Sequence, residues 1–185
     1  MRNRGLWIAA AVIVIVAAWG GFVYNRLVTL NEAVPAAWSQ VENVLQRRFD
    51  LIPNLVRTVR GYMKHERELL TEITRLRSQW GAARTTTARV EAANGLEGAL
   101  ARLMVLVERY PDLKANEGFL RLQDELAGTE NRIAVERMRY NETVRSYNVL
   151  VQRFPSNMLA AAFGFKKSEY FKMQAEAAGA PKVEF

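Results

Sequence analysis

The residues of this sequence best suited to chemistry lie between positions 65 and 72. They are His65, which is the only histidine of the chain, and the nearby carboxylates Glu66, Glu68 and Glu72. A zinc protease places two histidines one helical turn apart around a glutamate, and this chain has no second histidine to complete that spacing. We therefore predict a solvated histidine, and we assign no metal ligand and no cofactor.

The three carboxylates lie in an arginine-rich segment, where pairing with a basic residue one helical turn away is their ordinary role. Two acids that hydrolyse a substrate need a cleft to hold it. The chain has no cysteine, and it has neither a glycine-rich phosphate loop nor a nucleophile elbow. We predict no enzyme, no catalytic residue and no small-molecule substrate. A ligand-binding or hydrolytic pocket between helices, with converging Glu, Arg or His side chains, is the less favoured alternative.

The charge of the chain is less basic than its total suggests. The formal net charge is +7, but Arg2, Arg4 and Arg26 flank the first apolar segment, and without them 23 basic residues face 19 acidic ones. Opposite charges are interspersed over the remainder, which is typical of a solvated surface. No nucleic-acid partner is predicted.

The first apolar segment, Leu6 to Val23, contains 18 residues without a charge. At about 1.5 Å per residue, a helix of this length just crosses the hydrocarbon core of a bilayer. Trp7 and Trp19 place rings near its two ends, as interfacial aromatic residues do. We predict a retained transmembrane anchor defined by Leu6, Trp7, Trp19 and Val23. A cleaved signal peptide, cut near Ala18 and Gly20, is the alternative.

Apolar residues then recur in steps of three and four, which predicts helices throughout the rest of the chain. Because this pattern keeps its phase across Pro53, we predict one long helix from about 31 to about 80, bent at the proline. Its buried stripe is expected to comprise Val34, Trp38, Val41, Leu45, Phe49, Ile52, Val56, Val59, Met63, Leu70, Ile73 and Trp80.

Breaks at Gly81 to Ala88 and at Pro111 separate this helix from two more. The second carries Leu96 to Tyr110 on its apolar face, and the third extends from Phe119 to Phe154. A short fourth helix is expected after Pro155, with Ser156 as its cap and Gly164 as its stop. The predicted fold is all-α: a transmembrane helix followed by an antiparallel up-and-down bundle of three long helices and a short C-terminal helix.

Two groups of residues could form a surface for a partner or for lipid. The first is a basic stripe at helical spacing. The second mixes aromatic rings with lysines near the C-terminus. The first comprises Arg57, Arg60, Lys64 and Arg67, and the second comprises Phe165, Lys166, Lys167 and Phe171.

Two further tyrosines, Tyr140 and Tyr147, are each followed by an asparagine, Asn141 and Asn148. The two tyrosine rings are predicted to lie in the core, where a buried hydroxyl needs a hydrogen-bonding partner.

Three stretches resemble the LemA family of bacterial membrane-anchored proteins: "AWSQVENVLQRRFDLIPNLVRTVRGYMKHE", "ALARLMVLVERYPDLKANEGFLRLQDELAGTENRIAVERMRYNETVRSYNVLVQRFP" and "AAAFGFKKSEYF". The resemblance implies a single N-terminal span in the bacterial inner membrane, an antiparallel helical bundle, and no catalytic residues. It implies a cytoplasmic bundle, whereas the positive charges before the span favour a cytoplasmic N-terminus. The side of the membrane stays open.

The domains expected from the sequence are a basic N-terminus with the anchor (1–27), a LemA-like bundle (28–175) and a frayed tail (176–185). The expected function is that of a membrane-anchored interaction or scaffold protein, which contacts an unidentified protein partner or a second copy of itself. A membrane-surface-binding or remodelling factor is the alternative.

Overall fold

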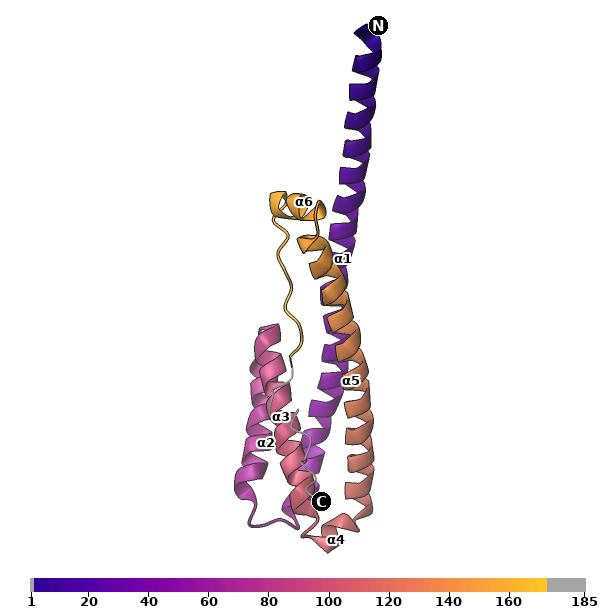
Figure 1. The fold of residues 1–185 in the computed structure, drawn as a ribbon. Coiled ribbons are helices and arrows are strands. Elements are labelled where there is room, and N and C mark those ends of the chain that lie inside the picture. The colour runs from indigo at the N-terminus through magenta and orange to yellow at the C-terminus, as the bar shows by residue number, and fades with distance from the viewer. Residues whose placement is uncertain (1, 173–185) are drawn as a thin grey trace, which may run out of the picture. The chain divides into compact units, whose positions relative to one another are not determined.

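The computed structural model describes the backbone of residues 2–172 and the side chains of residues 5–172. Within these residues the regular structure is entirely helical, which confirms the all-α class (Figure 1). The predicted tail at 176–185 lies outside the described residues. The helices found in the described part are α1 (Arg2–Arg60), α2 (Arg67–Ala82), α3 (Thr86–Val107), α4 (Pro111–Lys114), α5 (Glu117–Gln152) and α6 (Ser156–Ala162).

Helix α1 continues through Pro53 without a break, as the phase of the apolar pattern predicted. A proline inside a helix removes one backbone donor and costs about 3 kcal/mol. Burial on both sides offsets this cost, because Phe49, Ile52 and Leu55 are almost wholly removed from solvent while Pro53 itself is exposed.

The prediction that this helix extends to Trp80 was wrong. Helix α1 ends at Arg60, and a turn separates it from α2 at Arg67. The amides of Tyr62 and Met63 both donate to the carbonyl of Val59 and close the last turn. The apolar spacing survives because Met63, which belongs to the turn, is fully buried. A periodic pattern records burial, and a turn can keep that pattern without being helical.

The two predicted breaks are present but shorter than expected. Helix α3 begins at Thr86, and the hydroxyl of Thr85 caps it by accepting a hydrogen bond from the amide of Ala88 at 3.2 Å. Pro111 opens the short helix α4, where its missing donor costs nothing.

The short fourth helix is present as α6, although Ser156 is its first residue and not its cap. The Ser156 hydroxyl lies 2.6 Å from the carbonyl oxygen of Leu150 and 2.7 Å from that of Arg153. Gly164 follows α6 with φ +77°, the left-handed conformation that ends many helices and favours glycine.

The described residues form two compact units, one of 2–40 with 137–170 and one of 41–136 with 171–172. Helices α1 and α5 contribute to both, so that Trp38 belongs to the first unit and Val59 to the second. In the first unit α1 and α5 are antiparallel, because the Trp38 ring lies 5.6 Å from that of Tyr140 while Arg26 shares a hollow with Arg153.

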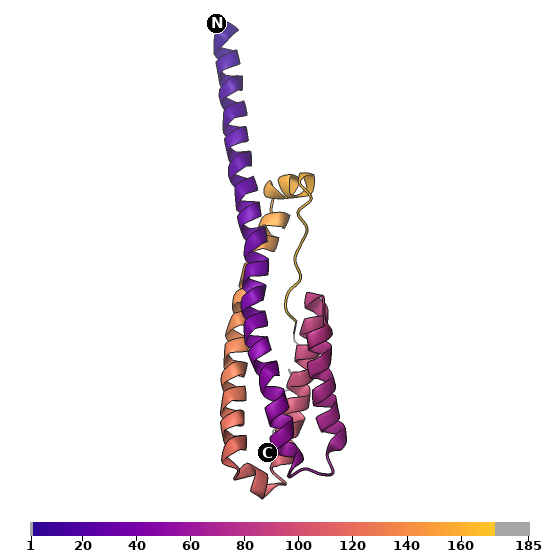
Figure 2. The same ribbon diagram turned by 180° about the vertical axis from the view of Figure 1, so that it is seen from behind.

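In the second unit α2 and α3 form an antiparallel pair that lies side by side in both views (Figures 1 and 2). Arg102 of α3 bonds Glu72 of α2 at 2.7 Å. The two helices approach closely at Gly95, where a Cβ atom would come within 2.7 Å of the Leu76 side chain. Helix α1 joins this pair through Phe49, whose ring stacks on Trp80 with a centroid distance of 4.6 Å.

Candidate functional site: an exposed apolar segment and a basic turn

The N-terminal part of α1 has an apolar surface that no described residue covers. Its large side chains from Leu6 to Val16 are all exposed, with 76% of Trp7 accessible. Of the described helices, α1 is the one that is long and apolar enough to cross a membrane. Length and composition make it a candidate span, and a signal sequence near an N-terminus has the same properties.

The exposed apolar surface stops where packing begins. Val23, predicted as part of the span, is only 6% exposed and forms a small core with Leu27 and Ala160. The rings of Tyr24 and Phe163 lie 4.8 Å apart beside this core. The end of the apolar run is therefore covered by α6, a partner that the sequence pattern did not reveal.

The residues of the predicted basic stripe lie at the end of α1, in the turn that follows it and at the start of α2. Arg60, Lys64 and Arg67 line a hollow of about 390 Å³ together with Met63, Leu70 and Thr71. Arg57 is exposed on α1 but does not line it. We call Arg60, Lys64 and Arg67 the basic turn. None of these side chains makes an ion pair with another residue between 5 and 172.

The position of Arg67 is not explained by helix stability. Arg57 and Arg60 occupy the last turn of α1, where a positive charge is favourable beside the negative end of the helix dipole. Arg67 is the first residue of α2, where a positive charge meets the positive end of the dipole. Helix stability alone therefore does not account for the basic residue at this position.

The residues that first suggested chemistry are dispersed. His65 is exposed, and among the described residues no three His, Asp or Glu side chains gather closely enough to hold a metal ion. Glu72 pairs with Arg102, while Glu66 lies 3.5 Å from the Arg109 guanidinium and accepts a hydrogen bond from the Tyr110 hydroxyl. The partners of these two carboxylates are thus distant in the sequence, 30 and 44 positions away for the hydrogen bonds, and the pairing is not the one-turn pairing predicted.

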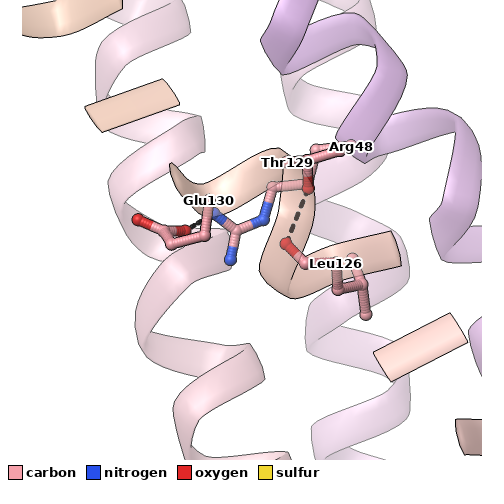
Figure 3. A network of polar contacts seen from close by, with 4 residues as sticks. All are labelled: Arg48, Leu126, Thr129 and Glu130. Carbon is pink, nitrogen blue, oxygen red and sulfur yellow. Dashed lines mark hydrogen bonds and ion pairs between the residues drawn. The ribbon is translucent and has the colours of Figure 1, made fainter. Parts of the chain in front are cut away.

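A second hollow, of about 290 Å³, contains converging polar groups (Figure 3). The Arg48 guanidinium, which is buried on α1, forms an ion pair with Glu130 of α5, and the Thr129 hydroxyl donates to the carbonyl of Leu126 at 2.8 Å. Because Arg48 and Glu130 are paired with each other, this ion pair joins α1 to α5 and does not present a free acid or base. The remaining lining combines the polar side chains of Glu97 and Gln123 with apolar residues of α3 and α5.

The four residues predicted to form a surface near the C-terminus differ in their burial. Phe165 packs on the core of Val23, Leu27 and Ala160, and Phe171 is buried in the second unit. Lys166 and Lys167 are exposed. These four residues therefore do not form one surface of rings and lysines.

The backbone at Ser168 and Glu169 is held by two side chains of α5, Tyr140 and Asn148. The Asn148 side-chain amide donates to the carbonyl of Ser168 and its oxygen accepts from the Ser168 amide, each at 2.9 Å. The Tyr140 hydroxyl donates to the carbonyl of Glu169 at 2.9 Å. The sequence predicted a partner for the buried hydroxyl, but it did not identify this backbone.

Alkaline pH is expected to destabilise the first unit. Burial, and then the nearby charge of Glu169, raises the pKa of Tyr140 above 10.0, and burial also raises that of Tyr147. An unfolded tyrosine titrates near pH ~10, so the stabilisation is complete below that pH and is lost as the pH rises through the higher folded pKa. Circular dichroism and tyrosinate absorbance of the detergent-solubilised chain, titrated in parallel, measure this loss.

The variant Tyr140→Phe distinguishes the contribution of Tyr140 to this alkaline transition from that of Tyr147. It removes one hydrogen bond, at a cost of about 1 kcal/mol at neutral pH, and it should make the alkaline transition less steep. The exposed Tyr170→Phe serves as a control. An unchanged transition in Tyr140→Phe would show that this hydroxyl does not couple folding to pH.

The sequence pattern that defines the LemA family matches residues 37–185. The chain belongs to the LemA family. The magnetosome protein MamQ 2 of Paramagnetospirillum magneticum is 30% identical, over 80% of this chain and 64% of the relative. MamQ of Magnetospirillum gryphiswaldense is 29% identical over the same shares, and protein LemA of Metamycoplasma hominis is 28% identical over 75% of this chain and 66% of its own length.

This LemA-family chain spans 64% of the length of the magnetosome relatives. The family match begins at position 37, after the apolar run, and includes the basic turn, the Arg48–Glu130 pair and α6. It confirms the predicted resemblance. The residues that sequence reasoning missed lie around α6: Phe154, predicted to be buried in the third helix, is exposed, as are Met158 and Phe163. The break at Pro155 was the signal that the periodicity of the third helix ends directly after Phe154 and before Met158 and Phe163.

Proposed function

We propose that this LemA-family protein is a membrane-anchored interaction module without catalytic activity. The apolar part of α1 spans the bilayer, the long helices form an antiparallel bundle, and the basic turn receives an acidic protein partner. The observation that carries this proposal is the uncovered apolar surface of α1 directly beside a packed helical core. Exposed apolar surface of this extent is characteristic of a contact with lipid or with another protein.

Arrangement and charge support the rest of the proposal. Helices α1 and α5 are antiparallel within the first unit, and α2 and α3 are antiparallel within the second. The basic turn offers three positive side chains around a hollow, with no carboxylate lining it. An acidic peptide segment fits this chemistry, because charge-assisted hydrogen bonds to carboxylates are stronger than those between neutral groups.

Membrane extraction tests the anchor. We expect the full chain to stay in the membrane fraction at alkaline pH and to need detergent for release, with its N-terminus intact. The variant Ile13→Arg with Val14→Arg places two charges in the middle of the run, each costing about 3 kcal/mol on insertion, and should shift the protein to the soluble fraction.

Val105→Arg with Met138→Arg is the matched control, since these two apolar side chains are also exposed but lie outside the run. Release of the wild-type chain by alkaline washing, or a mature N-terminus near residue 20, would exclude the anchor.

Proximity labelling in intact cells, from an enzyme fused after Phe185, tests the partner surface. Arg60→Glu with Lys64→Glu and Arg67→Glu should remove specific neighbours that the wild type labels. Reversing the charge of three other exposed arginines should leave the labelling of these neighbours unchanged. The three are Arg47, Arg77 and Arg121. Identical labelling by all three proteins would exclude the basic turn as the interaction surface.

A further inference from the structure

Four large apolar side chains on α6 and on the segments packed with it are exposed. We define the α6 collar as Phe22 of α1 together with Phe154, Met158 and Phe163, which are between 59% and 75% exposed. All four belong to the first unit. In both views α6 lies to one side of α1, next to the end of α5 (Figures 1 and 2).

The local structure of α6 directs Met158 away from the core. Ser156 and Ala160 are buried and share one face of the helix, which rests on the end of α5 and on Val23. At about 100° per residue, position 158 lies on the opposite side of the helix from both. The outward face of α6 therefore carries a long apolar side chain where a surface helix would carry a polar one.

The apolar run of α1 fixes the height of this surface relative to a bilayer. The run is 18 residues long, or about 27 Å as a helix, and the hydrocarbon core is about 30 Å thick. A run this short leaves no slack, so its last residue must lie at the boundary of the hydrocarbon. That residue is Val23, and it packs against Ala160 of α6.

The charges around the collar fit an anionic membrane surface. Four basic side chains of the first unit are exposed: Arg26, Arg153, Lys166 and Lys167. Arg26 and Arg153 line one hollow, together with Arg145 and a single carboxylate, Glu142. Residues 149–168 contain no acidic residue, and neither do residues 1–31. Basic side chains beside anionic headgroups, with aromatic rings at the same level, are the pattern of an interfacial helix.

We propose that the α6 collar is a second membrane contact, which lies in the interface of the bilayer that α1 spans and holds the first unit against anionic headgroups. This inference rests on the proposed anchor. Its occupant is lipid, because the same α1 that carries Phe22 delivers the collar to the edge of the hydrocarbon.

Site-directed spin labelling of the full chain tests this contact. The chain contains no cysteine, so each single-cysteine variant carries one nitroxide. Met158→Cys reports the collar, and Met138→Cys is its matched control, because both methionines belong to the first unit and are 65% and 63% exposed. Val14→Cys reports the proposed span. Each variant is reconstituted in vesicles of phosphatidylcholine and phosphatidylglycerol, and its relaxation by oxygen is compared with that by a water-soluble nickel chelate.

We expect the ratio of oxygen to nickel accessibility to be highest at 14, several times higher at 158 than at 138, and lowest at 138. Equal ratios at 158 and 138, with a high ratio at 14, would overturn the collar while leaving the anchor in place. A low ratio at 14 would overturn the anchor itself. Dipolar broadening between labels at 158 would show that a second copy of the chain covers the collar, and would also overturn the proposal.

Discussion

Replacing Phe49 by alanine is expected to lower the free energy of unfolding by about 3–5 kcal/mol. The ring is 1% exposed and stacks on Trp80 with an interplanar angle of 17°. Truncation leaves a cavity between α1 and α2, and it also uncovers the face of Trp80 on which Phe49 stacks. Urea unfolding of the detergent-solubilised chain, followed by tryptophan fluorescence, measures the loss.

Phe154→Ala is the matched control, because this ring is 75% exposed. We expect its effect to stay within about 0.5 kcal/mol. If the two variants unfolded at the same urea concentration, Phe49 would not be the core residue that the structure shows.

The variant Glu130→Ala is expected to cost about 3 kcal/mol, since it leaves the Arg48 guanidinium buried without the carboxylate that it contacts. Arg48 is 9% exposed, and its Nε atom has no hydrogen-bonding partner among the described residues. The charge cannot be relieved by losing a proton, because a guanidinium stays protonated in proteins. Thermal unfolding measured by circular dichroism reports the change.

A double variant distinguishes the value of the pair from the cost of breaking it. Arg48→Met with Glu130→Leu replaces both charges by apolar side chains of similar size, and should recover most of the stability that Glu130→Ala loses. A double variant no more stable than Glu130→Ala would mean that the ion pair contributes more than its desolvation costs.

A single span by itself restrains neither the tilt nor the rotation of what it carries. The α6 collar would restrain both for the first unit, because a surface contact beside the span removes two rotational freedoms. The proposed anchor, the collar and the basic turn consist of different residues, so each can be substituted and scored separately in one assay of membrane binding or labelling.

The sequence correctly predicted most of the helices, because helix signals are local. Apolar residues every three or four positions, interrupted at Gly81 and Pro111, are sufficient to separate α2, α3 and α5. The predicted stripe is buried at almost every position of α1 from Val34 to Val59. Continuity through Pro53 was also predicted correctly from the phase of the apolar stripe, although the same phase continues across the turn after Arg60, where the helix does end.

The candidate site was only partly predictable. The exposed arginines and the lysine of the basic turn could be found by their spacing, but the hollow between them arises from a turn that the periodic pattern concealed. The polar pair of Arg48 and Glu130 joins residues 82 positions apart, a pairing on which local spacing carries no information.

By itself, therefore, the sequence determined the all-α class, the apolar run and membership of the LemA family, because each depends on residue type and spacing along the chain. Only the tertiary structure decided that α1 ends at Arg60 and that Val23 packs on α6. It also decided that Asn148 and Tyr140 bind the backbone of Ser168 and Glu169. The physical reason is that an apolar position specifies burial but not the partner that buries it. A polar side chain, likewise, can satisfy its hydrogen bonds with any backbone that the fold brings near.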